Sequence, residues 1–182
     1  MALSLTRVDP AAEGEELVAF LTGNRFPFHV TESPTRGQVV AALRSGAYGD
    51  DDHAAFWLTD DTAGRVGLAR LEDLQDPTPM LDLRIAERVR GRGFGAAALR
   101  SITELVFTTM PEVNRFEGQT REDNIAMRKT FLRCGWVKEA HYREAWPVAG
   151  GAPVASVAYA ILRRDWATGT TTPVPWADGP HP

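Results

Sequence analysis

The chain has 182 residues, of which 43% are hydrophobic, and this length and composition predict one domain with a substantial core. Its formal net charge of −4 argues against bulk nucleic-acid binding, which needs a basic surface. The sequence contains no run of about 18 apolar residues, so we expect no membrane span. The N-terminal MALSLTRVDP lacks the pattern of a signal peptide, so we expect no signal peptide either.

Cysteine and histidine usage points away from disulfides and metals. The single cysteine, Cys134, excludes an internal disulfide and agrees with a reducing compartment, so we expect a cytoplasmic protein. The histidines have no spacing with cysteine or with one another that suggests a zinc site, and we expect no metal.

The first third of the chain predicts an edge strand and two helices. Residues 3–8 alternate weakly, as an edge strand does. Asp9 and Pro10 then favour the start of a helix that ends at Gly23. After an aromatic-rich loop, Ser33 and Pro34 favour the start of a second helix.

The rest of the chain alternates strands with two further helices. One helix is expected from Ala96 and another after Asn124, with Met127, Phe131 and Leu132 turned inward. Strands are expected at residues 53–58, 65–71, 80–85, 113–120, 136–146 and 154–162.

The C-terminal tail has a different composition. Prolines and threonines dominate residues 166–182, so we place the domain at residues 1–165 and the tail at 166–182. Trp166 and Trp176 are costly to leave in water. We therefore expect part of the tail to pack on the domain or on a second subunit, as in a homodimer.

Residues Arg90–Gly95 form a glycine- and arginine-rich turn between a predicted strand and a predicted helix. Such a turn presents free backbone N–H groups and the positive end of the helix dipole, a combination that binds phosphate. Arg90 and Arg92 add charge and planar donors. The alternative is an ordinary tight turn with two solvated arginines.

The spacing of this turn is R-x-x-G-x-G, which is neither the dinucleotide fingerprint nor a P-loop. It is the pyrophosphate-loop motif of the GNAT acetyltransferases. A second segment, Asn124 to Trp136, resembles that family's N-x-A-S pattern followed by Tyr and Gly-Phe. Residues 55–162 thus resemble the GNAT superfamily, most of all the ribosomal-protein-alanine acetyltransferases of RimJ/RimL type.

The resemblance implies an α/β GNAT fold: a mixed, mostly antiparallel sheet of about seven strands, splayed at its centre, with helices on both faces. It implies an N-acetyltransferase that moves the acetyl group of acetyl-CoA to a primary amine by direct attack in a ternary complex. The acceptor would be a protein N-terminus or a small amine. The cofactor-binding residues implied are Leu83, Ile85, Arg90, Gly91, Arg92, Gly93, Phe94, Gly95, Ala96, Asn124, Met127 and Phe131.

Two positions depart from the family pattern. The frequent Ser is Met127, and the frequent Tyr, which in many members protonates the departing CoA thiolate, is Phe131. The general acid is therefore left open. A non-catalytic acyl-CoA-binding module is the alternative function that Phe131 suggests.

The resemblance also locates candidates for chemistry. Asp82 and Glu117 lie near the expected splay and are the candidate general bases, each with the alternative of a surface or salt-bridged carboxylate. Arg84 shares a strand face with Asp82 and could neutralise it. Phe28 and His29 are expected on the acceptor wall, with a satisfied loop histidine as the alternative for His29.

Overall fold

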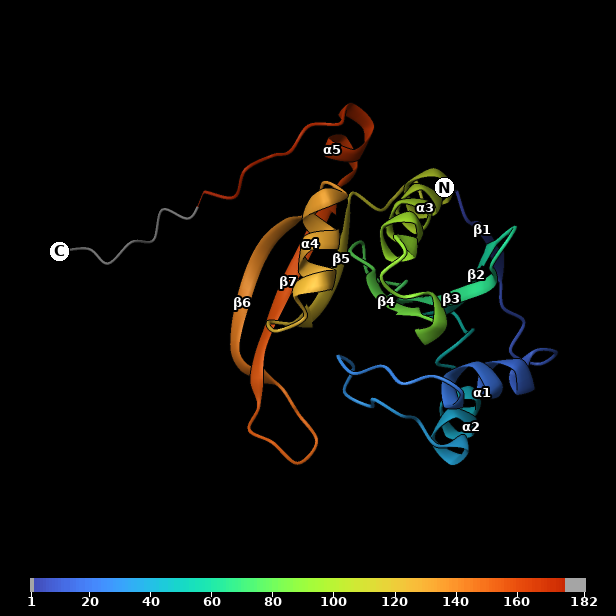
Figure 1. The fold of residues 1–182 in the computed structure, drawn as a ribbon. Coiled ribbons are helices and arrows are strands. Elements are labelled where there is room, and N and C mark those ends of the chain that lie inside the picture. Colours follow the sequence, from blue (N-terminus) through green and yellow to red (C-terminus); the bar gives the residue numbers. More distant parts are fainter. Residues whose placement is uncertain (1, 176–182) are drawn as a thin grey trace.

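The computed structural model describes residues 2–175, and its central element is one seven-stranded sheet with strand order β1-β2-β3-β4-β5-β7-β6 (Figure 1). Among these strands, only the β4–β5 pair is parallel. The mixed, mostly antiparallel sheet expected from the sequence is confirmed. Its strands are β1 (Ser4–Arg7), β2 (Ala54–Asp60), β3 (Gly64–Glu72), β4 (Met80–Ile85), β5 (Arg115–Arg121), β6 (Val137–Trp146) and β7 (Val154–Leu162).

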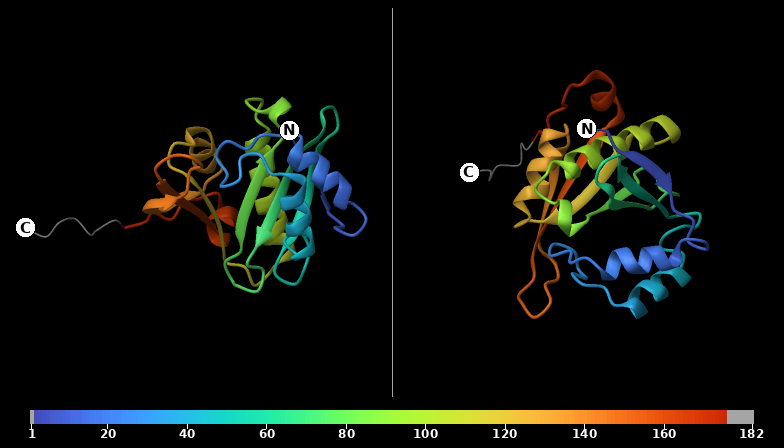
Figure 2. Two further views of the ribbon diagram at one scale, coloured as in Figure 1. Left: turned by 90° about the horizontal axis from the view of Figure 1, so that it is seen from below. Right: turned by 45° about the vertical axis from the view of Figure 1, so that its right-hand side comes forward.

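Helices cover both faces of the sheet, as predicted (Figure 2). Successive side chains of a strand point to opposite faces. In β2, Ala55 and Trp57 therefore join a core with α1 and α2, whereas Phe56 and Leu58 join the main core under α3. The helices are α1 (Gly14–Thr22), α2 (Arg36–Arg44), α3 (Phe94–Thr109), α4 (Ile125–Arg133) and α5 (Arg163–Thr168), with a 3₁₀ turn at Glu87–Val89.

The sheet splays between β4 and β5. Their parallel pairing consists of Met80 with Glu117 and Leu81 with Gly118, whereas β4 pairs with β3 along its whole length. The C-terminal half of β4 therefore borders a gap instead of a strand. This is the splay that the family resemblance implies.

Backbone groups of Leu83 and Ile85 face this gap. The N–H of Ala86 donates to the carbonyl of Val66 on the β3 side (2.8 Å). Because backbone groups alternate in direction along a strand, those of Ile85 and Leu83 point away from β3. The carbonyl of Ile85 accepts a hydrogen bond from Arg90, outside the sheet.

Both N-terminal helices start later than the sequence predicted. The carboxylate of Asp9 accepts from the N–H groups of Ala11 and Ala12 in a separate turn, and α1 begins only at Gly14. The α2 helix begins after Thr35, which forms a reciprocal capping box with Gln38. This box satisfies the backbone N–H groups of Thr35 and Gln38.

Two further expectations concern single side chains. Leu132 was predicted to point inward, but it is 59% exposed, because α4 turns Phe131 to the core and Leu132 to solvent. Trp166 packs on its own domain, where its ring centroid lies 5.4 Å from the ring centroid of Phe107. Trp176 lies outside the described residues. The helix α5 runs through residue 168 and so crosses the expected boundary at residue 165.

Among residues 2–175, no helix is both long and apolar enough to cross a bilayer.

Candidate active site

Two adjoining cavities open at the splay. We call the one of about 350 Å³ beside the Arg90–Gly95 turn the turn cavity, and the one of about 330 Å³ around Asp82 the ion-pair cavity. Residues from the loop after α1, from β4 and from α4 line both. These shared residues are Phe28, His29, Leu83, Asn124 and Met127.

The Arg90–Gly95 turn gives the turn cavity an anion-binding wall. Gly91 and Gly93 have φ of 76° and 88°, a left-handed conformation that only glycine adopts without strain. Gly93 is the N-cap of α3 and supplies no side-chain cap, so the first N–H groups of the helix stay available. A Cβ built on Gly95 would meet no atom within 4 Å. The wall therefore admits a group that contacts backbone directly, as a phosphate does.

Arg90 has a structural role in this arrangement. Its Nε donates to the carbonyl of Ile85 (3.0 Å) and its Nη2 to that of Arg25 (2.5 Å). Burial lowers the pKa of the Arg90 guanidinium. Arg90 thus joins the turn to the end of β4 and to the aromatic-rich loop.

The other predicted cofactor residues divide into three groups. Leu83, Ile85, Gly91, Gly93, Gly95, Ala96, Asn124 and Met127 line the turn cavity together with Arg90. Phe131 lines the ion-pair cavity only. Arg92 and Phe94 line neither cavity, because Phe94 is buried in the core beneath the turn and the Arg92 guanidinium lies 5.6 Å from the Phe94 ring centre.

Asn124 fixes the start of α4 at the junction of the cavities. Its Oδ1 accepts from the N–H of Met127 (3.2 Å), and its Nδ2 donates to the hydroxyl of Thr120 (2.9 Å). From this start, Ala126, Thr130 and Arg133 follow at helical spacing and also line the turn cavity. None of these three is predicted from the sequence, although their spacing places them on one face of the helix.

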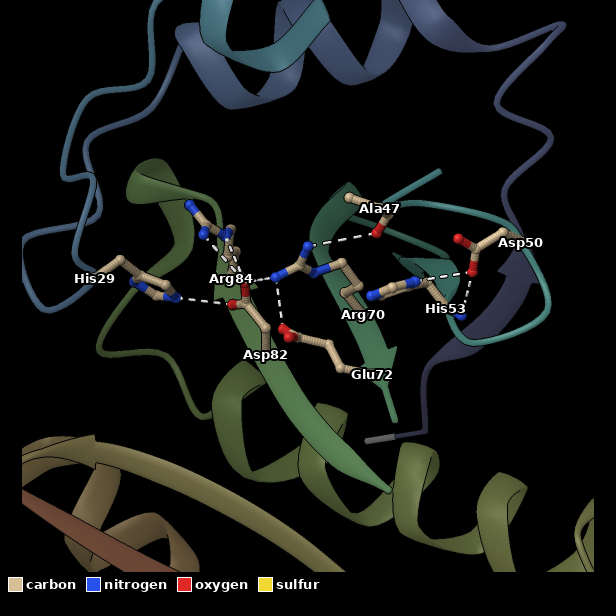
Figure 3. A network of polar contacts seen from close by, with 8 residues as sticks. All are labelled: His29, Ala47, Asp50, His53, Arg70, Glu72, Asp82 and Arg84. Atoms are coloured by element: carbon tan, nitrogen blue, oxygen red, sulfur yellow. Dashed lines mark hydrogen bonds and ion pairs between the residues drawn. The ribbon is translucent and has the colours of Figure 1, made fainter. Parts of the chain in front are cut away.

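Asp82 is the centre of the ion-pair cavity (Figure 3). Its carboxylate lies 3.0 Å from His29 Nε2, 3.0 Å from Arg84 Nη2 and 3.4 Å from Arg70 Nη2. Burial would raise the pKa of Asp82, but the Arg84 guanidinium, the His29 ring and the Arg70 guanidinium hold it well below its usual range. Asp82 therefore stays ionised and is a poor proton acceptor. The predicted Asp82–Arg84 pair is present.

His29 is the partner of Asp82 that comes from the aromatic-rich loop. Its other ring nitrogen, Nδ1, is buried and has no hydrogen-bond partner in the part of the chain that the structure describes. The loop is held on both sides of the splay, by Arg90 at Arg25 and by Arg121, which donates to the carbonyl of Pro27 (3.0 Å). His29 is thus fixed where the two cavities meet.

The second candidate base, Glu117, is not brought to the site. It lines neither cavity, and it accepts hydrogen bonds from Arg115 (2.6 Å) and Gln119 (3.1 Å) on its own strand. Glu72 does line the ion-pair cavity, where Arg70 donates to it at 2.5 Å. Arg70 was not singled out from the sequence, although it pairs with Asp82 in the β3–β4 register.

Among residues 2–175, no three histidine, cysteine or carboxylate side chains are grouped closely enough to hold a metal ion.

Comparison with solved structures shows that the fold is a known one. A chimera of the spermidine N-acetyltransferase SpeG from Vibrio cholerae and hSSAT aligns with a TM-score of 0.76 at 16% identity, over 92% of this chain and 99% of that one. The Vibrio cholerae spermidine N-acetyltransferase in complex with CoA and spermine aligns with the same TM-score and identity, over 91% and 98%. The spermidine/spermine N-acetyltransferase SpeG of Vibrio cholerae in complex with manganese ions aligns at 0.71 and 18%, over 92% and 96%.

A search of curated proteins finds no match. A family model described as "Acetyltransferase (GNAT) domain" matches residues 5–137, well over half of the 182-residue chain. This match covers the turn, the splay and the start of the last hairpin. The chain therefore belongs to the GNAT acetyltransferase family.

Proposed function

We propose that this protein is an N-acetyltransferase that moves the acetyl group of acetyl-CoA to a primary amine. The observation that carries the proposal is the meeting of two cavities at one point of the splay. The turn cavity takes the cofactor and the ion-pair cavity takes the amine. Their shared residues, among them Leu83 and His29, surround the place where thioester and amine react.

The cofactor would enter with its pyrophosphate against the N–H groups of the Arg90–Gly95 turn. Its pantetheine arm would follow the gap, bounded by the backbone of Leu83 and Ile85 and by Met127 of α4. A backbone N–H that faces the gap can polarise the thioester carbonyl, because it is already oriented and needs no reorganisation.

The chemistry supported is direct attack of the amine in a ternary complex. The amine nitrogen would bond to the carbonyl carbon, and the C–S bond would break to release the CoA thiolate. Burial raises the pKa of the only thiol, Cys134, and this residue lines neither of the two cavities. An acetyl-cysteine intermediate is therefore disfavoured.

The charges of the ion-pair cavity favour an acceptor with a single amine. Both of its carboxylates, Glu72 and Asp82, are already paired with Arg70 or Arg84. A polyamine needs uncompensated negative charge at several points. We therefore favour the α-amine of a peptide N-terminus over spermidine, the substrate in the names of the solved relatives. This acceptor class agrees with the resemblance to the RimJ/RimL type and with a cytoplasmic enzyme.

The α-amine also suits the chemistry. The pKa of an α-amine is about 8, so roughly a tenth of it is uncharged at neutral pH. The pKa of a lysine side chain is about 10.4, so almost all of it is protonated. The enzyme then needs to remove a proton only during or after attack.

The test is release of CoA thiol from acetyl-CoA with a panel of amines: an alanine-terminated peptide, the same peptide with a blocked N-terminus, and spermidine. Thiol release with the free peptide, and a peptide product heavier by one acetyl group, are expected. Tight binding of CoA without thiol release above the hydrolysis background would instead support a non-catalytic acyl-CoA-binding module.

A further inference from the structure

We propose that His29 accepts the proton of the attacking amine and that Asp82 holds its ring in position for this step. The inference rests on the proposed acetyl transfer and deepens it, because neither the family match nor the relatives assign a proton acceptor. His29 would be a catalytic residue, and Asp82 a positioning residue that acts through it.

The position of His29 is the first argument. It lines both cavities, so it borders the point at which an amine in one would meet a thioester in the other. Its ring is also well fixed, by the Asp82 carboxylate at 3.0 Å and by edge-to-face contact with Phe26, whose ring centre lies 5.6 Å away. A proton acceptor needs this combination of location and order.

The second argument concerns the tautomer. An ionised carboxylate can only accept hydrogen bonds, so the neutral His29 ring must carry its proton on Nε2, which faces Asp82. This leaves a lone pair on Nδ1, the buried ring nitrogen that no group of residues 2–175 contacts through a hydrogen bond. A buried acceptor left unsatisfied in this way is unusual and calls for an explanation, such as a role in catalysis. Nδ1 has almost no accessible surface in this ligand-free arrangement, so its lone pair meets the amine only when the ring or its loop shifts as the acceptor binds.

The third argument is the unsuitability of the other groups. The charged side chains that line the two cavities with His29 are Asp82 and Arg84 on β4, Arg70 and Glu72 on β3, Arg90 in the turn and Arg133 on α4. Guanidinium groups stay protonated at all working pH values. Both carboxylates are held in ion pairs. No lysine, cysteine or tyrosine lines either cavity within the described residues. Histidine is also the side chain that ordinarily titrates near neutral pH.

The step balances as follows. The amine lone pair forms the new C–N bond, and the nitrogen becomes positively charged. Its proton passes to Nδ1 of His29, and the imidazolium is stabilised by the negative charge of Asp82. The C–S bond breaks with its electrons on sulfur, and the proton then passes from Nδ1 to the thiolate. The products are the amide and CoA thiol, and His29 returns to its neutral form.

The deciding experiment compares His29→Gln with His53→Gln. His53 forms a similar pair with Asp50 at 2.8 Å but lines neither cavity, so it is the matched control. Acetylation of the alanine-terminated peptide and of a second peptide whose N-terminal amine has a different pKa is measured from about pH 5.5 to 9, the range in which histidine side chains ordinarily titrate. Acetyl-CoA affinity is measured by calorimetry.

We expect His29→Gln to lower kcat/KM by about 10²–10⁴-fold, the usual value of general acid–base catalysis, with acetyl-CoA affinity unchanged. The acidic limb of the wild-type profile that is common to both acceptors should disappear. His53→Gln should match the wild type. Asp82→Asn should shift the same limb, because the ring loses the carboxylate that holds its tautomer and stabilises its charge.

The outcomes separate this inference from the proposed function. Active His29→Gln with a wild-type pH profile would overturn the role of His29 and leave acetyl transfer standing. A loss of rate with the limb unchanged would also overturn it, since that is the result of a structural role. Nitrogen NMR of the wild type in the neutral state should show the Nε2–H tautomer of His29, and the Nδ1–H tautomer would refute the proposal without any turnover. A wild type inactive with every amine would refute the proposed function itself.

Discussion

The ring tip of Phe131 lies directly against Gly118, the residue at the last β4–β5 pair before the splay. A Cβ built on Gly118 would be 2.9 Å from Cζ of Phe131, closer than real carbon atoms approach. Phe131 cannot retreat easily, because its ring stacks on Tyr159 with centroids 4.8 Å apart and is 1% exposed. Glycine at this strand position thus makes room for an aromatic ring on the ion-pair cavity.

Gly118→Ala is therefore expected to destabilise the fold by about 1–3 kcal/mol, the usual range for overpacking a buried site. Urea denaturation measures the loss. The control is Gly37→Ala in α2, where a Cβ would meet nothing within 4 Å, and which should be neutral or slightly stabilising. A second substitution, Phe131→Leu, should recover part of the loss by vacating the contact. Equal stability of wild type and Gly118→Ala would contradict the packing argument.

Gly95→Ala should weaken acetyl-CoA binding by at least about tenfold, or 1.4 kcal/mol, and leave the fold intact. The added Cβ meets no protein atom, so it projects only into the space where the cofactor would approach the backbone. Gly93→Ala is a poorer test, because φ of 88° at this position adds backbone strain. Calorimetric titration with acetyl-CoA gives the affinity, again with Gly37→Ala as control. Unchanged acetyl-CoA affinity in a folded Gly95→Ala variant would show that the pyrophosphate does not bind at this turn.

The Asp82 cluster should make stability depend on pH in the acid range. The pKa of Asp82 is lower in the folded than in the unfolded state. Its contribution to the free energy of unfolding is therefore complete above the unfolded pKa of about 3.9, and it is lost as the pH falls from there toward the folded pKa. Asp82→Asn removes this group from the titration. The variant should be less stable than the wild type at pH 7, and the difference should shrink below about pH 4. A difference that stays constant from about pH 7 to about pH 3 would contradict the assignment.

The sequence predicted those parts of the fold and site that depend on local patterns. The glycine turn, the Asn124 cap and the Asp82–Arg84 pair each involve residues only a few positions apart in the chain, and the structure contains all three. The start of α2 was also local, but Ser33 and Pro34 gave a stronger apparent signal than the capping box that begins at Thr35.

Pairings between distant segments could not be predicted in this way. His29 and Asp82 are 53 residues apart, and only the path of the aromatic-rich loop across the splay brings them together. Arg163 is a second case. From the start of α5 it donates to the carbonyls of Phe107 and Met110 at the end of α3, which lie 56 and 53 residues earlier in the chain. No local pattern distinguishes such an arginine from a solvated one.

Phe131→Tyr should raise kcat by less than about tenfold. A general acid that was missing would be worth about 10²–10⁴-fold when restored. Two features reduce the gain expected here. The pKa of an alkyl thiol is about 8.5, so the thiolate leaves readily at neutral pH. By our inference, His29 also returns the amine proton to this thiolate. The new hydroxyl would also grow from Cζ, the atom pressed against Gly118. Steady-state rates with the alanine-terminated peptide, together with acetyl-CoA affinity, measure the effect. A rise in kcat of about a hundredfold at unchanged affinity would mean that the native protein lacks an acid, and it would count against His29 and in favour of a binding module.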